Sequence, residues 1–276
     1  MQHNISEELL SARLRAAGCV FAEDEARLLL GQAADLSATA GEPETLERMV
    51  QQRCAGLPLE QVLGWAEFYG LRIPVAPEVF VPRRRTELLA GHSIELLRNL
   101  RYPVFVELCC GSGAVSVAVA AHIEPVLEAY AVDIQSAAVA CAGMNLEGQA
   151  SVFQGDLFSA LPSALRGRID VVAANAPYVP TAKLETMPPE ARDHEPAMTL
   201  DGGSDGLDVL RRIIESVADW LGPDGSVLVE CSRRQAGAVQ QLMSAQDLWP
   251  EILCREDPEA TIAVGRHTLG KAAPAI

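Results

Sequence analysis

The stretch "VFVELCCGSGAVSVAVAAH", residues 104–122, combines the three features that decide the fold. It begins with a short apolar run typical of a buried strand, continues through a glycine-rich turn, and ends in small residues that predict a helix. The pattern recurs downstream, with strands expected at 128–134, 150–158, 169–176 and 225–232. Strands that alternate with helices predict a parallel sheet covered by helices on both faces.

The last two apolar runs, "EILCRED" (251–257) and "ATIAVGRH" (260–267), have only Pro258 and Glu259 between them. A connection this short cannot make a parallel crossover, so the last strand should run antiparallel to its neighbours. We therefore expect an α/β fold with a mostly parallel sheet and an antiparallel last strand. This is the Rossmann-like architecture of class I methyltransferases.

The sequence patterns divide the chain into three parts. Residues 1–72 place apolar side chains at helical spacing and predict a small N-terminal helical bundle. Residues 73–102 contain prolines at positions 74, 77 and 82 and predict a linker or hairpin followed by a connecting helix. Residues 103–276 are expected to form the cofactor-binding domain.

The composition narrows the class of protein. A net charge of −15 disfavours charge-driven binding to nucleic acid, and we expect no direct nucleic-acid partner. The tract Arg83-Arg84-Arg85 is short and is interpreted as a solvated loop. The seven cysteines have no zinc-site spacing, so we expect buried thiols and no metal. Without a signal-peptide pattern or a long apolar run, the expected location is the cytoplasm, with no membrane partner.

Acidic and glycine residues lie at the ends of three successive expected strands. The first strand contains Glu107 and leads into Gly111 and Gly113, where the backbone can approach a ligand. Asp133 follows Gly113 by 20 residues, a spacing at which a carboxylate can accept ribose hydroxyls. Asp156 ends the third strand, where it is suited to an adenine amino group.

This combination favours an adenosine-type cofactor, either NAD or S-adenosylmethionine. Ser116 stands where a dinucleotide fingerprint has Gly or Ala, which disfavours NAD. Glu107 is expected to orient the cofactor or the loop rather than to act as a base. The expected cofactor-binding residues are Glu107, Cys109, Gly111, Gly113, Asp133, Ile134, Asp156, Leu157 and Asn175.

The fourth strand ends in the tetrapeptide Asn175-Ala176-Pro177-Tyr178, which is expected to carry the chemistry. An amide nitrogen is a poor nucleophile, because its lone pair is delocalised into the carbonyl. A site that methylates it needs acceptors that hold its N–H groups and aim the nitrogen at the methyl carbon. The Asn175 side-chain oxygen and the Ala176 carbonyl are candidates, with Pro177 fixing the turn and Tyr178 packing on the planar group. Such catalysis would rest mainly on positioning.

Four segments together resemble a known family. "VELCCGSGAVSVAVA", "AVDIQSAAVACAGMNL", "GDLF" and "NAPY" resemble the successive motifs of S-adenosylmethionine-dependent methyltransferases with an N/D-P-P-Y signature. More closely, the chain is similar to the protein N(5)-glutamine methyltransferases of the HemK/PrmC family, over nearly its whole length. The resemblance implies S-adenosylmethionine as cofactor and methylation of the glutamine in the Gly-Gly-Gln motif of peptide-chain release factors. It also implies that the N-terminal helices help to dock the release factor.

The sequence departs from the family pattern at several positions. Ala176 replaces the usual second residue of the signature, a proline, and Cys109 replaces the first glycine of the cofactor loop. Arg84 and Arg85 stand where the family usually has proline and an acid. These changes leave the reaction type in place but open the question of the acceptor.

Three alternatives therefore stay open. The protein could be a paralogue that methylates a small molecule or another protein's amide or amine, or a noncatalytic cofactor-binding protein. A nucleic-acid methyltransferase is disfavoured by the acidity of the chain. His194 and Glu195, on the loop after the signature, are candidate substrate-loop residues, and an ordinary solvated loop is an equal reading for them.

Overall fold

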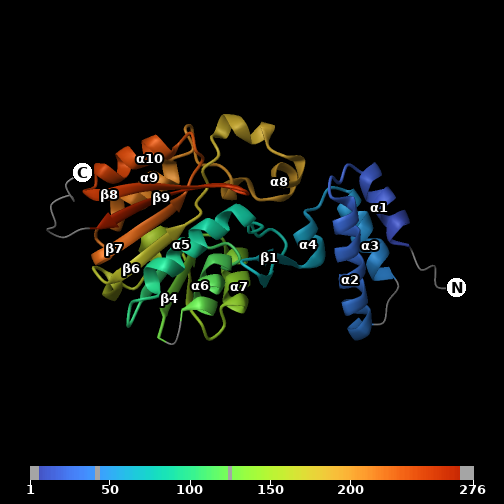
Figure 1. Cartoon of the computed structure of the whole chain (residues 1–276), viewed down its shortest axis with the longest axis horizontal. Coiled ribbons are helices and arrows are strands. Elements are labelled where there is room, and N and C mark those ends of the chain that lie inside the picture. The colour runs from blue at the N-terminus through green and yellow to red at the C-terminus, as the bar shows by residue number, and fades with distance from the viewer. Residues whose placement is uncertain (1–5, 41–43, 124–125, 268–276) are drawn as a thin grey trace.

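Figure 1 presents the computed structural model of the protein, which describes residues 6–40, 44–123 and 126–267. The helices are α1 (Glu7–Ala16), α2 (Ala22–Ala40), α3 (Glu44–Cys54), α4 (Leu59–Leu63), α5 (Glu87–Leu97), α6 (Ala114–His122), α7 (Ser136–Asn145), α8 (Pro189–His194), α9 (Asp208–Val217) and α10 (Ala236–Ser244). The strands are β1 (Trp65–Phe68), β2 (Leu71–Pro74), β3 (Val104–Leu108), β4 (Glu128–Asp133), β5 (Ser151–Gln154), β6 (Ile169–Ala174), β7 (Leu221–Glu230), β8 (Leu248–Glu256) and β9 (Glu259–His267).

Seven strands form one sheet in the order β5-β4-β3-β6-β7-β9-β8. The pairs from β5 to β7 are all parallel, whereas β9 is antiparallel to both β7 and β8. The expected mostly parallel sheet with an antiparallel last strand is therefore confirmed. The two remaining strands, β1 and β2, pair as a separate antiparallel hairpin.

Two strands that lead into the site are shorter than the sequence predicted. β5 ends at Gln154 instead of residue 158, and β6 ends at Ala174 instead of residue 176. Leu157 takes a left-handed φ of 50°, which is incompatible with an extended strand. Pro177 has no N–H with which to continue a sheet ladder. Asp156 and Asn175 consequently lie just past the sheet, free of strand pairing.

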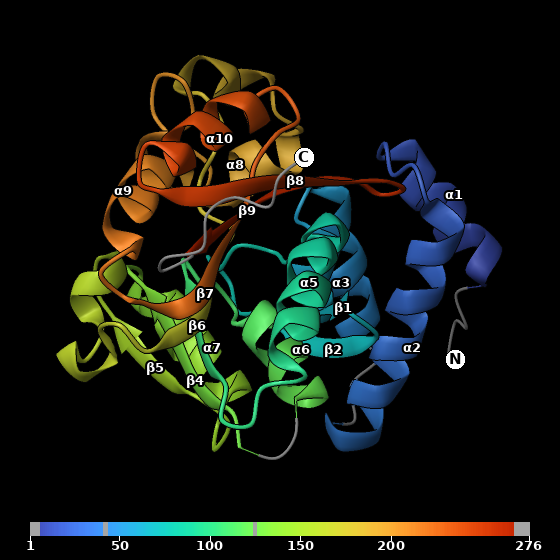
Figure 2. The same ribbon diagram turned by 60° about the vertical axis from the view of Figure 1, so that its left-hand side comes forward.

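The core lies on both faces of the large sheet, as the alternation of strands and helices predicted. One buried cluster joins the sheet to α9 and α10 through apolar residues such as Ile213, Ile214 and Val239. A second joins the opposite face to α5 and α6 through Leu89, Val115 and others. Figure 2 shows these two pairs of helices on opposite sides of the sheet.

Helices α1 to α4 bury a cluster of their own. Its core includes Leu10, Leu14, Leu29 and Val50, which lie on inward faces of α1, α2 and α3. Ser6 caps α1 by accepting a hydrogen bond from the Leu9 amide at 3.3 Å. Figure 1 shows this group of helices beside the large sheet. The domain boundaries drawn from the sequence stay a prediction.

One buried arginine connects this helical group to the segment that follows the signature. Arg53, with a side chain only 6% exposed, pairs with Glu25 of α2 at 2.6 Å. The same guanidinium pairs with Glu190 of α8, also at 2.6 Å. It also donates to the carbonyl of Leu57 at 2.9 Å. Arg53 therefore joins α2, α3 and α8 through one charged group.

The cysteine thiols were expected to be buried. All seven cysteines are free, and four are buried, but Cys254 is exposed. Its position on β8, the edge strand of the sheet, gives it a solvent-facing side, so the prediction of a buried thiol is wrong there.

No described helix is long and apolar enough to cross a membrane.

Replacement of Arg53 by methionine should destabilise the protein by about 3–5 kcal/mol, because it leaves the buried Glu25 carboxylate without its partner. Urea unfolding followed by far-ultraviolet circular dichroism measures this cost. Arg13→Met is the matched control, because Arg13 pairs with Glu47 on the exposed surface and should contribute less than about 1 kcal/mol. Equal costs for the two variants would contradict the importance of the buried pair.

Candidate active site

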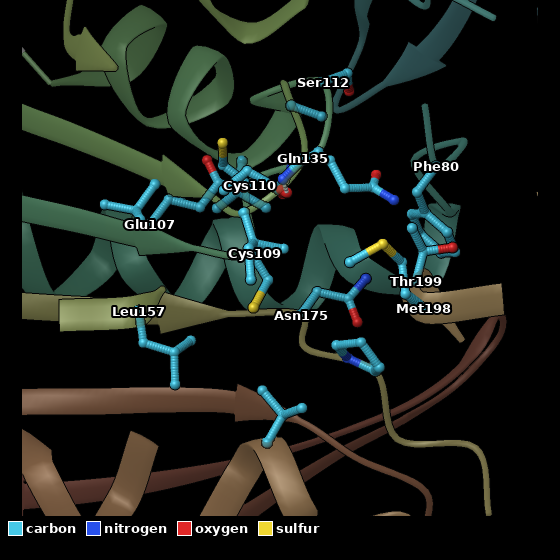
Figure 3. Close-up of a pocket in the computed structure, with 18 of the residues that line it drawn as sticks. Phe80, Glu107, Cys109, Cys110, Ser112, Gln135, Leu157, Asn175, Met198 and Thr199 are labelled. Carbon is cyan, nitrogen blue, oxygen red and sulfur yellow. Dashed lines mark hydrogen bonds between the residues drawn. The ribbon is translucent and has the colours of Figure 1, made fainter. Parts of the chain in front are cut away.

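A cavity lies at the edge of the sheet where the carboxyl ends of β3, β4, β5 and β6 meet (Figure 3). This is the edge at which open parallel sheets bind ligands. Of the residues predicted to bind a cofactor, the lining includes Glu107, Cys109, Gly111, Asp133, Ile134, Asp156, Leu157 and Asn175. Gly113 does not line the cavity. It lies at the start of α6 instead.

The loop after β3 has a backbone that suits small residues. Gly113 has a φ of 76°, and a Cβ there would lie 2.9 Å from Leu146 Cδ1, so its lack of a side chain serves packing. Gly111 also has a positive φ, and its N–H donates to Asp133 Oδ2 at 2.9 Å. Cys109 has a φ of 55°, a conformation that is uncommon for a residue with a side chain. The loop is thus bent toward the cavity and tied to β4.

Glu107 is buried beneath this loop. Its Oε2 accepts hydrogen bonds from the Ser116 N–H at 2.8 Å and from the Ser116 hydroxyl. Burial raises the pKa of the Glu107 carboxyl to about 7, although the bonds from Ser116 oppose this shift. Glu107 therefore anchors the first turn of α6, and its expected role in orienting the cofactor stays a prediction.

Two further carboxylates border the cavity. Asp133 accepts from the amides of Gly111 and Gln135, each at 2.9 Å, and burial raises its pKa. Each of its oxygens keeps a lone pair for another donor. Asp156 pairs with Arg212 of α9 at 2.6 Å, and both side chains are about half exposed. The cavity therefore holds three acidic groups and one arginine, a balance that suits a cationic ligand.

Apolar side chains cover part of the same cavity. Ile134 and Met198 line it although they are 53% and 52% exposed. Exposed apolar groups around a cavity are typical of a site that covers a ligand's ring. Cys109 also lines the cavity, where burial raises the pKa of its thiol. That thiol stays protonated at neutral pH and is no thiolate nucleophile.

Asn175 extends from the end of β6 toward the cavity (Figure 3). Its Nδ2 donates to the hydroxyl of Thr86 at 3.2 Å, and this bond fixes which way the amide faces. Among the described residues, none donates a hydrogen bond to Asn175 Oδ1 or to the Ala176 carbonyl oxygen. Two adjacent acceptors at the end of this strand therefore have no partner among the described residues, and Ala176 is itself only 1% exposed.

A second cavity adjoins the first and shares Phe80, Asn175, Pro177 and Thr199 with it. Ala176 and Tyr178 line only the second cavity. The tetrapeptide therefore stands between the two, with Asn175 and Pro177 on the boundary. A ligand in the first cavity and an acceptor in the second would meet at Asn175.

The arginine tract is not a solvated loop, and that interpretation is wrong for two of its three residues. Arg83 Nη2 lies 2.6 Å from Glu195 Oε1, and Arg85 Nε lies 3.0 Å from Glu230 Oε1. Both glutamate side chains are buried, so each attracts an arginine as its counter-charge. Both arginines line the second cavity.

The two candidate residues of the post-signature loop have different surroundings. Glu195 lines the second cavity, and it accepts from the Val81 amide at 3.2 Å as well as from Arg83. His194 lines neither of the two cavities. It ends α8 close to Gly56, where an added Cβ would lie 3.4 Å from His194 Nε2.

Several lining residues were not predicted. Thr86 and Phe80 come from the linker, Met198 and Thr199 from the post-signature segment, and Arg212 from α9. None of these five residues was assigned a role from the sequence, although His194 and Glu195 were candidates on the post-signature segment.

Comparison with known proteins identifies the family. No family model matches the chain. A release factor glutamine methyltransferase of Streptomyces coelicolor is 37% identical over 206 residues, which cover 74% of this chain and 73% of that protein. The chain belongs to the release factor glutamine methyltransferase family. The sequence resemblance to this family is thereby confirmed.

The relatives also include a protein named for a small acceptor. The 4-amino-L-phenylalanine/4-methylamino-L-phenylalanine methyltransferase of Streptomyces pristinaespiralis is 33% identical over 82% of this chain and 79% of its own length. A solved methyltransferase structure from Pyrococcus furiosus has a TM-score of 0.52 at 14% identity, over 73% of this chain and 91% of that one. The expected methyltransferase fold is thus confirmed. Relatives of this protein are thus named for two different acceptors, a release factor glutamine and an amino acid.

Replacement of Glu107 by glutamine should change how stability depends on pH. The pKa of Glu107 is raised to about 7, so the folded protein binds this proton more tightly than the unfolded chain does. The stability that Glu107 contributes is present at low pH and is lost as the pH rises through about 7. Between about pH 5 and pH 8, the variant's free energy of unfolding should therefore gain roughly 2–3 kcal/mol relative to wild type. Urea titrations across this range measure the difference, and a constant difference would contradict the raised pKa.

Proposed function

We propose that this protein is an S-adenosylmethionine-dependent methyltransferase that methylates the side-chain amide of the glutamine in the Gly-Gly-Gln motif of peptide-chain release factors. The pair of available acceptors, Asn175 Oδ1 and the Ala176 carbonyl, is the observation that carries this proposal. A primary amide has two N–H donors on one nitrogen, and two adjacent acceptors match them. The names of the relatives support the choice of acceptor.

The first cavity fits the cofactor. The carboxylate of Asp133 keeps lone pairs for the ribose hydroxyls, and the exposed face of Ile134 suits the adenine ring. Arg212 balances Asp156, and the pKa of Glu107 is raised to about 7, so Asp133 carries most of the negative charge that favours a sulfonium cation over an anionic ligand. S-adenosylmethionine, when bound, supplies a methyl group that is already activated by its positive sulfur.

The chain's own residues then have to orient the acceptor amide. Asn175 Oδ1 and the Ala176 carbonyl hold the two N–H groups, and Thr86 keeps the Asn175 oxygen facing the amide. Tyr178 packs against the planar carboxamide from the second cavity. The amide nitrogen gains the methyl group and gives up one proton to water. Because the residues position and do not react, the rate enhancement comes from orientation.

The second cavity suits a neutral acceptor group. Its two arginines are each paired with a buried carboxylate, so they contribute little net charge. Glu190, at the same cavity, is paired with Arg53. A carboxamide can enter such a cavity without leaving a charge unpaired. We assign residues 1–72 to docking of the release factor in the cytoplasm, and residues 103–276 to binding of the cofactor.

A second candidate is N-methylation of a small aromatic amine. The Streptomyces pristinaespiralis relative, named for 4-amino-L-phenylalanine, favours it. Incubation of the enzyme with labelled S-adenosylmethionine and either 4-amino-L-phenylalanine or a release factor compares the two candidates directly.

The decisive experiment is methyl transfer to a purified release factor of the same host, followed by peptide mass spectrometry. We expect one added methyl group on the glutamine of the Gly-Gly-Gln peptide. An unmodified peptide, with cofactor binding verified by calorimetry, would overturn the release-factor assignment. Transfer to 4-amino-L-phenylalanine in the same preparation would then select the second candidate.

Two variants separate the roles of the two cavities. Asn175→Ala should lower kcat by on the order of 100-fold, because one of the two orienting acceptors is lost, while the Kd for S-adenosylmethionine stays nearly unchanged. Asp133→Ala should instead weaken cofactor binding about tenfold or more, because it removes hydrogen bonds to a charged group. Calorimetry and initial rates give both constants, and full activity of Asn175→Ala would rule out the two-acceptor mechanism.

A further inference from the structure

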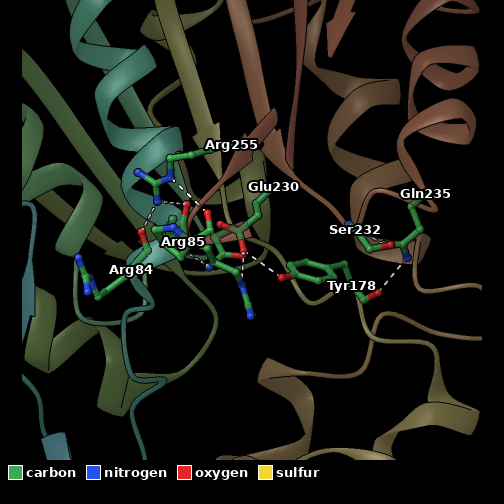
Figure 4. A network of polar contacts seen from close by, with 10 residues as sticks. Arg84, Arg85, Tyr178, Glu230, Ser232, Gln235 and Arg255 are labelled. Carbon is green, nitrogen blue, oxygen red and sulfur yellow. Dashed lines mark hydrogen bonds and ion pairs between the residues drawn. The ribbon is translucent and has the colours of Figure 1, made fainter. Parts of the chain in front are cut away.

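A buried carboxylate lies behind Tyr178, outside the groups that the proposed mechanism uses. Glu230 ends β7, and its side chain is only 1% exposed. Its Oε1 accepts from the Tyr178 hydroxyl at 2.9 Å and from Arg85 Nε at 3.0 Å (Figure 4). Its Oε2 is buried and has no described partner. One oxygen atom therefore holds both side chains.

Tyr178 and Arg85 are also fixed to each other and to the backbone around them. The Arg85 guanidinium carbon lies 5.9 Å from the centroid of the Tyr178 ring. Gln235 donates to the Tyr178 carbonyl at 2.9 Å, so this residue is held at its main chain as well as at its phenol. Arg255 donates to the Arg84 carbonyl at 2.7 Å, and this bond anchors the backbone next to Arg85 (Figure 4).

The stability of the fold is a weak reason for a buried glutamate at position 230. Burial of a carboxylate with one unsatisfied oxygen costs free energy, and a buried ion pair seldom stabilises a fold more than apolar residues of similar size do. Its two partners, however, both line the second cavity. Precise sites are commonly supported by hydrogen bonds from residues behind those that touch the ligand.

We propose that Glu230 is a positioning residue that sets the Tyr178 ring and the Arg85 guanidinium as one rigid wall of the acceptor cavity. This inference rests on the proposed function, because it concerns the acceptor side of the same site. Glu230 does not touch the acceptor itself and acts through Tyr178 and Arg85. The wall packs on the acceptor carboxamide equally before and during methyl transfer, so its loss weakens acceptor binding more than it slows the chemical step.

The protonation of Tyr178 agrees with this role. Burial raises the pKa of the Tyr178 phenol, and the charge of Glu230 raises it further, while Arg85 opposes both. The phenol therefore remains a hydrogen-bond donor at neutral pH. A carboxylate is the matching acceptor for that donor, whereas a neutral amide at position 230 would bind it more weakly.

Glu230→Gln tests the proposal, because it keeps the shape of the side chain and removes its charge. We expect the KM for the release factor to rise about tenfold, as for the loss of one hydrogen bond to a charged group, with kcat changed less than about threefold. The Kd for S-adenosylmethionine should stay within about twofold of wild type. Glu251→Gln is the matched control, because it removes a carboxylate that pairs with Arg266 on the exposed face of the last strands.

A double-mutant cycle separates positioning through Tyr178 from a general loss of folding. Tyr178→Phe should raise the same KM, and the double variant Tyr178→Phe/Glu230→Gln should be little worse than either single variant. Additive effects would show that Glu230 acts independently of Tyr178 and would overturn the proposal. An unchanged KM in Glu230→Gln would overturn it as well.

The contact itself is tested without any acceptor. Ultraviolet titration of the tyrosines, after subtraction of the signal of a matched Tyr178→Phe variant, measures the pKa of Tyr178. This pKa should be lower in Glu230→Gln than in wild type, because the neighbouring negative charge is gone. An unchanged pKa would overturn the positioning role whatever the acceptor is. If wild type transfers no methyl group to the release factor, the proposed function fails, and the titration still decides the role of Glu230.

Discussion

The parallel pairing of β3 with β4 and β6 is the constraint on which the candidate site depends. It brings the ends of these strands to one edge of the sheet, so Glu107, Asp133 and Asn175 lie around one cavity although they are far apart in the chain. The hydrogen bond from the Gly111 amide to Asp133 then ties two of the strand ends together. Without this register, the acidic groups would not act on a common ligand.

The two cavities are stabilised by different physical means. In the first cavity, hydrogen bonds from backbone amides stabilise Asp133 and Glu107, and only Asp156 is paired with an arginine, Arg212. Arginine side chains neutralise those of the second, as at Glu195 and Glu230. Backbone donors are fixed by the fold, whereas arginine donors change with a single substitution. The second cavity, which we propose holds the acceptor, is therefore the part of the site on which a change of substrate would act most directly.

The sequence was sufficient for those features that depend on local pattern. The order of strands and helices, the antiparallel last strand and the carboxylate at Asp133 all follow from neighbouring residues and regular spacing. The partners of Arg83 and Arg85 lie 112 and 145 residues away, so nothing local could reveal them. The early end of β5 was also missed, because the left-handed conformation of Leu157 arises only in the folded chain. The early end of β6 had a local signal in Pro177 that the predicted range did not use.

The ion pair between Arg53 and Glu190 has a consequence for how this architecture can evolve. Glu190 lines the second cavity, the proposed acceptor cavity, yet its charge is balanced by Arg53, from a helix near the start of the chain. The N-terminal helices and the acceptor cavity are therefore not interchangeable modules. A chimaera that took these helices from a relative without a matching cation would introduce an uncompensated anion at the rim of the cavity, so the two regions are expected to diverge together.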